Sequence, residues 1–171
     1  MAEYVQYWRP ISFPRKALIT SEGEVERYLY FVEEGVQRSF YIYNNKEHII
    51  AFTYPPSASG IPESFYNQSP SRYYLETLTP SRLLRITFTD HQRLMAKHRQ
   101  LETLSRISAE QLLSGLLVRY FELMAYDMET RFKSFVKRSP HLLQFIPQKY
   151  LAAYLRIDPT NFSKLMGSVK I

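Results

Sequence analysis

Residues 146–166 read IPQKYLAAYLRIDPTNFSKLM. Pro147 suits the first turn of a helix, where a missing N–H costs nothing. Asp158 followed by Pro159 is typical of an N-cap and the first residue of a second helix. Between them, residues 156–157 leave room only for a tight turn. The segment therefore predicts two short helices that cross closely.

The apolar positions of this segment predict which faces pack together. Leu151, Ala152 and Leu155 share one face of the first helix, and Phe162, Leu165 and Met166 share one face of the second. The remaining positions of the second helix are Thr160, Asn161, Ser163 and Lys164. Such side chains bind phosphates and base edges in a major groove, which a recognition helix reads chiefly through its first residues. We count Lys149 of the first helix as a further candidate DNA-binding residue; a helical hairpin without a nucleic-acid role is the alternative.

The net charge of +6 is concentrated in the last quarter of the chain. Residues 131–171 hold 8 Lys and Arg against one acid, Asp158, for a net charge of +7. Residues 1–130 hold 14 Lys and Arg against 15 Asp and Glu, for a net charge of −1. A neutral body with a basic end indicates an anionic partner for that end. A solubilising tail is the simpler alternative.

Residues 13–88 have the pattern of a β domain. Strands are expected over 28–32, 36–43, 48–53, 72–78 and 82–88, with a hairpin turn at 44–46. The 14 Tyr and 11 Phe of the chain fit β structure with large core side chains. Several short strands at this spacing indicate a sandwich or a barrel.

A long helix is predicted after the strands, with Thr89 and Asp90 as its cap. Leu113, Leu117, Tyr120, Met124 and Met128 form one apolar stripe, and Leu112, Leu116 and Leu123 form a second. Two stripes mean that the helix buries two faces. One face can pack on the β domain, and the same helix of a second subunit is the economical partner for the other. A central helix inside a monomeric core is the alternative.

Several kinds of chemistry are excluded or disfavoured by the composition. The chain has no Cys, which excludes disulfides, thiolate zinc sites, iron–sulfur clusters and cysteine nucleophiles. His48, His91, His98 and His141 lack metal-ligand spacing, so we expect them at the surface or as caps. No hydrolase, phosphate-loop or metalloprotease motif is present, so we expect no enzyme. With neither a signal peptide nor an apolar run of ~18 residues, we expect a cytoplasmic protein without a membrane partner.

Read in order, three stretches resemble the Crp/Fnr family of regulators, in the branch common in Bacteroidetes. They are SEGEV with YLYFVEEG at 21–35, ESFYNQSPSR at 63–72, and the helix pair at 146–164. The resemblance implies an α+β fold with a jelly-roll (double-stranded β-helix) sensor over 1–100 and a dimerisation helix over 101–130. A winged-helix-like helix-turn-helix over 131–171 follows, its wing short or absent. It also implies a homodimer that binds double-stranded DNA with recognition helices roughly 34 Å apart.

The resemblance also implies a ligand site in the stretch 63–72. In relatives that bind cyclic AMP, an arginine neutralises the phosphate and a glutamate accepts a hydrogen bond from the ribose. Arg72 matches the arginine, but Pro62 stands where the glutamate is expected, and Tyr73 is bulkier than the usual hydroxyl residue. Candidate ligand residues are Glu63, Ser71, Arg72 and Tyr73. We expect a small anionic or nucleotide ligand, if any, and not cyclic AMP. The alternative for Arg72 is a surface or strand-edge arginine paired with a carboxylate such as Glu76.

Features of the C-terminal segment keep a second function open. Relatives often carry glycine at the turn where Arg156 stands, and Gly167 follows the second helix soon after. A chain that ends at Ile171 leaves little room for a wing. The alternative function is a ligand-binding or protein-interaction module that keeps the barrel and does not bind DNA.

Overall fold

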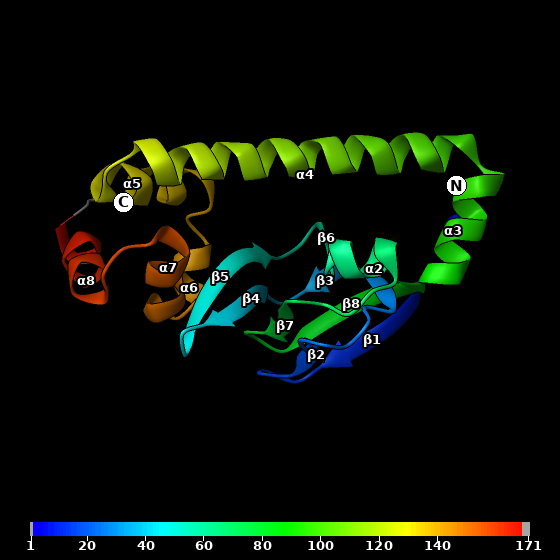
Figure 1. Ribbon diagram of the computed structural model, residues 1–171, viewed down its shortest axis with the longest axis horizontal. Helices are drawn as coiled ribbons and strands as arrows, with labels where there is room; N and C mark the ends of the chain where they lie inside the picture. Colours follow the sequence, from blue (N-terminus) through cyan, green and yellow to red (C-terminus); the bar gives the residue numbers. More distant parts are fainter. Residues whose placement is uncertain (1, 169–171) are drawn as a thin grey trace. The chain divides into compact units, whose positions relative to one another are not determined.

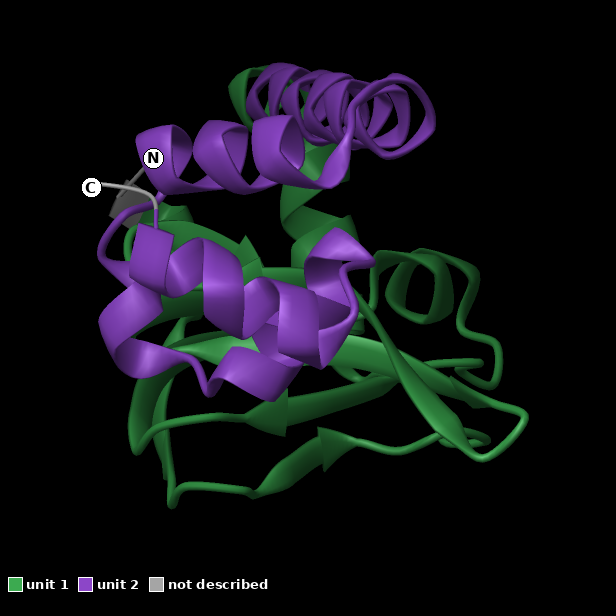
Figure 2. Ribbon diagram, turned by 90° about the vertical axis from the view of Figure 1, so that its left-hand side faces the viewer, with its two compact units in different colours: residues 1–102 green, residues 103–171 purple. Residues whose placement is uncertain are grey.

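The computed structural model describes residues 2–168, which divide into two compact units (Figure 2). One unit is Met1–Glu102 and the other is Thr103–Ile171.

The first unit is a β domain with helices at its ends (Figure 1). Its elements are α1 Ala2–Val5, β1 Arg9–Phe13, β2 Leu18–Thr20, β3 Tyr28–Glu34, β4 Gln37–Tyr43, β5 Lys46–Thr53, β6 Ser57–Ser59, α2 Pro62–Asn67, β7 Tyr74–Thr77, β8 Ser81–Thr87 and α3 Phe88–Lys97. The strands form two four-stranded antiparallel sheets, in the orders β1-β8-β3-β6 and β2-β7-β4-β5. This jelly-roll-like arrangement confirms the predicted β fold.

The core of this unit lies between the two sheets. Val32 of β3 pairs in register with Leu83 of β8, and both are fully buried. Leu75 of β7 and Ile61, just before α2, join them in one apolar cluster. Alternation along β3 sends Tyr28, Tyr30 and Val32 toward this cluster, as the period of a half-buried strand requires.

Two turns of the β domain depend on left-handed backbone. Gly35 joins β3 to β4 at φ +92°, and a Cβ there would lie 2.5 Å from the Pro80 carbonyl oxygen, so only glycine fits. Asn44 and Asn45 both have positive φ at the β4–β5 hairpin. Two such residues in succession make the turn type that matches the twist of paired strands, as the sequence predicted.

The N-cap of α3 is Thr87 and not Thr89. The Thr87 hydroxyl accepts a hydrogen bond from the backbone N–H of Asp90 at 3.1 Å and donates one to the Asp90 carboxylate at 2.8 Å. The helix therefore begins at Phe88, directly after β8. The expected cap was wrong because the Thr87 hydroxyl, three residues before Asp90, satisfies the Asp90 N–H and so starts the helix earlier.

His91 is buried, with 2% of its surface exposed, so the expectation of a surface or capping role was wrong for this residue. Its Nδ1 lies 3.1 Å from the Tyr4 hydroxyl, and its ring contacts Phe65 and Tyr66 of α2. Aromatic side chains from α1 and α2 enclose it, which the local sequence does not reveal. Burial holds the pKa of His91 below its ordinary value.

The second unit is helical. Helix α4 spans Arg99–Ala125 and crosses the boundary between the units; the remaining elements are α5 Met128–Arg138, α6 Leu142–Phe145, α7 Gln148–Leu155 and α8 Pro159–Ser168. Phe132 of α5 and Phe162 of α8 are buried with their rings edge to face at 5.5 Å. Residues 103–168 contain no strand.

Helix α4 ends before Met128, so the apolar stripe expected on it stops at Met124. Asp127 accepts a hydrogen bond from the Thr130 N–H at 2.8 Å and starts α5. Leu112 and Leu116 of the second stripe are exposed, as are the residues of the first. Within the second unit, these residues of α4 are therefore not packed into a core.

Arg38 of β4 is a buried cation, with 2% of its side chain exposed. Its guanidinium bonds Glu76 at 2.6 Å and Glu47 at 2.5 Å, and it lies 4.0 Å over the Phe40 ring. Glu76 thus pairs with Arg38, whereas Arg72 forms the expected kind of surface pair with another carboxylate, Glu63. In register, Glu76 on β7 lies directly opposite Arg38, which brings their side chains together.

We expect Arg38→Met to lower the free energy of unfolding by about 3 kcal/mol, because it leaves two carboxylates without their shared cation. Urea unfolding followed by circular dichroism measures this. Arg82→Met is the matched control: that arginine also pairs with two glutamates, Glu33 and Glu34, but is half exposed, so its loss costs less than about 1 kcal/mol. Equal losses in the two variants would contradict the assignment.

Glu26 is a buried carboxylate that anchors the start of β3. It accepts a hydrogen bond from the Thr20 hydroxyl at 2.6 Å and one from the Tyr28 N–H at 3.3 Å. Its own N–H bonds the hydroxyl of Ser64 in α2 at 2.9 Å. Desolvation by burial raises the pKa of Glu26 above its ordinary value of 4.5.

A raised pKa means that the folded protein binds more protons than the unfolded chain at and above pH 4.5. This contribution to stability is complete below pH 4.5 and is lost as the pH rises through the folded pKa. Since Glu26→Gln cannot titrate, we expect its stability relative to the natural chain to rise from pH 4.5 to neutrality. Urea unfolding at several pH values measures the difference, and a difference that does not change with pH would contradict the raised pKa.

Candidate functional site

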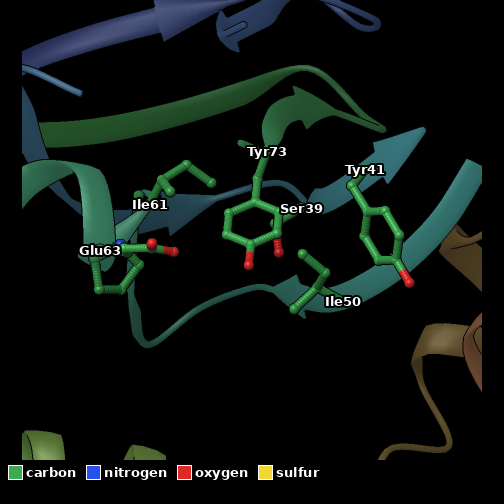
Figure 3. A pocket seen from close by; sticks show the side chains of 8 residues that line it. Ser39, Tyr41, Ile50, Ile61, Glu63 and Tyr73 are labelled. Carbon is green, nitrogen blue, oxygen red and sulfur yellow. The ribbon is translucent and has the colours of Figure 1, made fainter. Parts of the chain in front are cut away.

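Helix α2 and the sheet of β4 and β5 frame a pocket in the β unit (Figure 3). The helix starts at Pro62, which pre-sets its first turn, and Phe65 anchors it as a fully buried side chain. The pocket has a volume of about 250 Å³. It is lined by Ser39, Tyr41, Ile50, Gly60, Ile61, Pro62, Glu63 and Tyr73.

Glu63 is the charged residue of this lining. It lies in the first turn of α2, and its carboxylate points toward the Tyr73 ring in Figure 3. Its Oε1 also accepts a hydrogen bond from Nη2 of Arg72 at 2.7 Å. This hydrogen bond raises the pKa of the Arg72 guanidinium above its ordinary value.

Arg72 itself does not line the pocket, and 73% of its side chain is exposed. The arginine expected to neutralise a ligand phosphate is therefore turned outward and held by Glu63. A cyclic phosphate in the pocket would lie beside a carboxylate instead of a guanidinium.

Ser71 is buried, and its hydroxyl is occupied by the backbone next to it. It donates to the Tyr73 carbonyl at 2.8 Å and accepts from the Tyr73 N–H at 3.0 Å. The Ser71 hydroxyl thus holds the backbone of Tyr73 in place, and both of its hydrogen bonds are made within the chain.

Two tyrosine rings form one wall of the pocket. Tyr73 and Tyr41 lie edge to face at 6.4 Å with an angle of 71°. Tyr41 stacks on His48 of β5 at 4.9 Å. Sequence reasoning named Tyr73 but missed Tyr41 and Ser39; their two-residue spacing along β4 places them on one face and was the available signal.

The tight turn between α7 and α8 closes in the left-handed region. Arg156 ends α7 at φ 53° and ψ 46°, and its N–H bonds the carbonyls of Ala152 and Ala153. The chain thus adopts the backbone for which relatives use glycine, at a cost of about 1–2 kcal/mol. The Asp158 carboxylate then accepts hydrogen bonds from the N–H groups of Thr160 and Asn161, at 2.9 and 3.3 Å.

The candidate DNA-binding residues differ in exposure. Thr160, Ser163 and Lys164 of α8 and Lys149 of α7 are exposed. Asn161 is half-buried, and its amide nitrogen lies 3.9 Å from the sulfur of Met128 in α5. The outer face of α8 is therefore formed by two hydroxyl residues and a lysine, with Asn161 at its edge.

Helix α4 carries a long apolar surface. Every residue from 106 to 118 is exposed. The exposed apolar side chains are Leu104, Ile107, Leu112, Leu113, Leu116, Leu117, Val118, Tyr120, Phe121 and Met124. None of the helices within residues 2–168 combines the length and apolar character needed to cross a bilayer. In the same part of the chain, no three His, Asp and Glu side chains are grouped to hold a metal ion.

Comparisons with known proteins agree with this architecture. The cyclic nucleotide-binding domain family matches residues 10–98, just over half of the chain. Among solved structures, FixK2 from Bradyrhizobium japonicum superposes with a TM-score of 0.84 at 15% identity, over 94% of this chain and 83% of that one. No curated protein matches.

Two further structures show the same fold. A CooA mutant from Carboxydothermus hydrogenoformans has a TM-score of 0.73 at 15% identity, covering 96% of this chain and 77% of that one. The catabolite activator protein of Thermus thermophilus has a TM-score of 0.60 at 18% identity, covering 98% and 80%. These neighbours are Crp/Fnr regulators. The two-sheet β domain and its match over residues 10–98 show that the chain belongs to the cyclic nucleotide-binding domain family, with the fold of Crp/Fnr regulators.

Proposed function

We propose that the protein is a dimeric, DNA-binding transcription regulator of the Crp/Fnr type. Residues 1–100 form its sensor barrel, 101–130 its dimerisation helix and 131–171 its DNA-binding head. The observation that carries this proposal is the capped helix α8, whose outer face is polar and cationic within a segment of net charge +7.

Helix α8 fits the role of a recognition helix. Its first turn presents Thr160, and the next turn presents Ser163 and Lys164, all exposed. Recognition helices read base edges chiefly from their first residues, and lysines hold the phosphates that set register. Lys149 of α7 supplies a second positive charge for the DNA backbone.

The exposed apolar surface of α4 supports a homodimer. Leu113, Leu117, Tyr120 and Met124 are each more than half exposed. An apolar surface this long is costly in water and marks an interaction site. The same helix of a second subunit covers it by symmetry, and two heads carried on one dimer suit two successive major grooves.

A second function is a ligand-binding or protein-interaction module without DNA binding. It is favoured by Arg156 in the left-handed turn and by Asn161, whose amide faces Met128. This module would keep the pocket and the dimer helix but would prefer no DNA sequence.

The DNA-binding proposal is tested with DNA from upstream of the protein's own gene. Binding is measured by fluorescence anisotropy at a series of salt concentrations from ~50 mM upward. Electrostatic affinity for DNA is greatest at the lowest of these concentrations. We expect Lys164→Ala to weaken binding about threefold to tenfold and to reduce the salt slope by about one, because one phosphate contact is lost. Asn161→Ala weakens binding less, since that amide is turned toward Met128.

Lys97→Ala is the matched control, because it removes an exposed lysine from the β unit. Equal effects of Lys97→Ala and Lys164→Ala would contradict the placement of α8 in the groove. No binding at ~50 mM salt would favour the module without DNA binding.

The dimer is tested by sedimentation velocity. We expect the natural chain to sediment as a dimer and Leu117→Arg as a monomer, because an unpaired charge at the centre of the apolar surface opposes association. Glu110→Gln, on an exposed polar position of the same helix, should leave the dimer intact. A natural chain that sediments as a monomer at micromolar concentration would contradict the proposal.

A further inference from the structure

The lining of the pocket in the β unit includes one carboxylate and two tyrosine rings. The carboxylate of Glu63 points toward the Tyr73 ring, and Tyr41 closes the wall edge to face with Tyr73 (Figure 3). The faces of aromatic rings carry negative potential, so a carboxylate and two tyrosines together attract positive charge.

A cation of the chain itself already lies against these groups. The Arg72 guanidinium bonds Glu63 at 2.7 Å, and its central carbon lies 5.8 Å from the centre of the Tyr73 ring. This guanidinium approaches from solvent, with 73% of its side chain exposed. The Glu63 carboxylate and the Tyr73 ring therefore contact the Arg72 guanidinium on the solvent side, and both residues also line the pocket.

Two donors beside the pocket are engaged within the chain itself. The Ser71 hydroxyl donates to the Tyr73 carbonyl, and the Tyr73 N–H donates to the Ser71 hydroxyl. The charged residue of the lining is Glu63, which would repel a phosphate.

We propose that this pocket binds a small organic cation, a primary or methylated ammonium on a compact apolar body. The ammonium group lies against Glu63 and the rings of Tyr73 and Tyr41. The apolar body packs on Ile50 and Ile61, which line the remaining walls. Cation binding is a property of the pocket alone. Only the further step, that the bound cation regulates DNA binding, rests on the proposed sensor role.

The experiment uses the full chain without DNA and two matched pairs of probes. Choline is compared with its uncharged carbon analogue 3,3-dimethylbutan-1-ol, and phenethylammonium with 2-phenylethanol. Calorimetric titration and thermal shift report binding, since a ligand that binds the folded state raises the melting temperature. We expect at least one cation to bind about fivefold or more tightly than its neutral partner, and cyclic AMP not to bind.

Variants of the two charged residues give opposite results for a cation and for a nucleotide. Arg72→Ala removes the competing guanidinium, so we expect the cation to bind about threefold more tightly, whereas a nucleotide site would lose its phosphate partner. Glu63→Gln keeps the shape of the side chain and should weaken the cation about fivefold or more. Glu110→Gln, on α4, should leave the affinity unchanged.

Three outcomes would overturn the assignment. They are the absence of binding by both cations at ~10 mM, equal affinity for a cation and its neutral partner, and cyclic AMP binding that Arg72→Ala abolishes. Each leaves the DNA and sedimentation measurements untouched, and a failure of DNA binding leaves the calorimetric result standing. The two proposals can therefore fail separately.

Discussion

The stability of the β unit depends on the burial of the two sheet faces that pack against each other. Val32 and Leu83 from one sheet meet Leu75 from the other, and no water-accessible surface of Val32 or Leu83 remains. This contact fixes the distance between the sheets and therefore the place of everything attached to their edges. Ile61 belongs to the same cluster, so the chain that enters α2 is held by the core. The pocket beside α2 is thus built on the best-packed part of the unit.

The charged side chains of this unit differ in burial according to the oppositely charged side chains that bond them. Arg38 is buried because Glu76 and Glu47 both bond it, and breaking that set leaves charges that the interior does not tolerate. At the pocket, by contrast, Glu63 and Arg72 form an exposed pair, which contributes little stability and can open at small cost. The buried Arg38 pairs are therefore a fixed part of the sheet, whereas the exposed Arg72–Glu63 pair beside the pocket can be replaced by other contacts.

The helical unit shows how few residues orient a helix. Arg156 turns the chain through the left-handed region, and Asp158 then satisfies the first N–H groups of α8. Phe162 packs against Phe132 and orients α8, and Thr160, Ser163 and Lys164 are exposed on its outer face. Helix α4 is held near its C-terminal end, where Glu122 bonds Ser134 and Arg138 of α5. The apolar side chains along the rest of α4 stay exposed, and together with the polar outer face of α8 they are the basis of the proposed dimeric regulator.

Features that depend on a few neighbouring residues could be predicted from the sequence alone. The Asn44–Asn45 hairpin, the Asp158 cap and the order of strands, long helix and helix pair follow from backbone preference and periodicity, which act locally. Only the tertiary structure decided that Arg72 pairs with Glu63, that His91 is enclosed by aromatic rings and that Tyr41 enters the pocket. Those relations join residues distant in sequence, and they depend on sheet register and helix docking, which no short stretch of sequence contains.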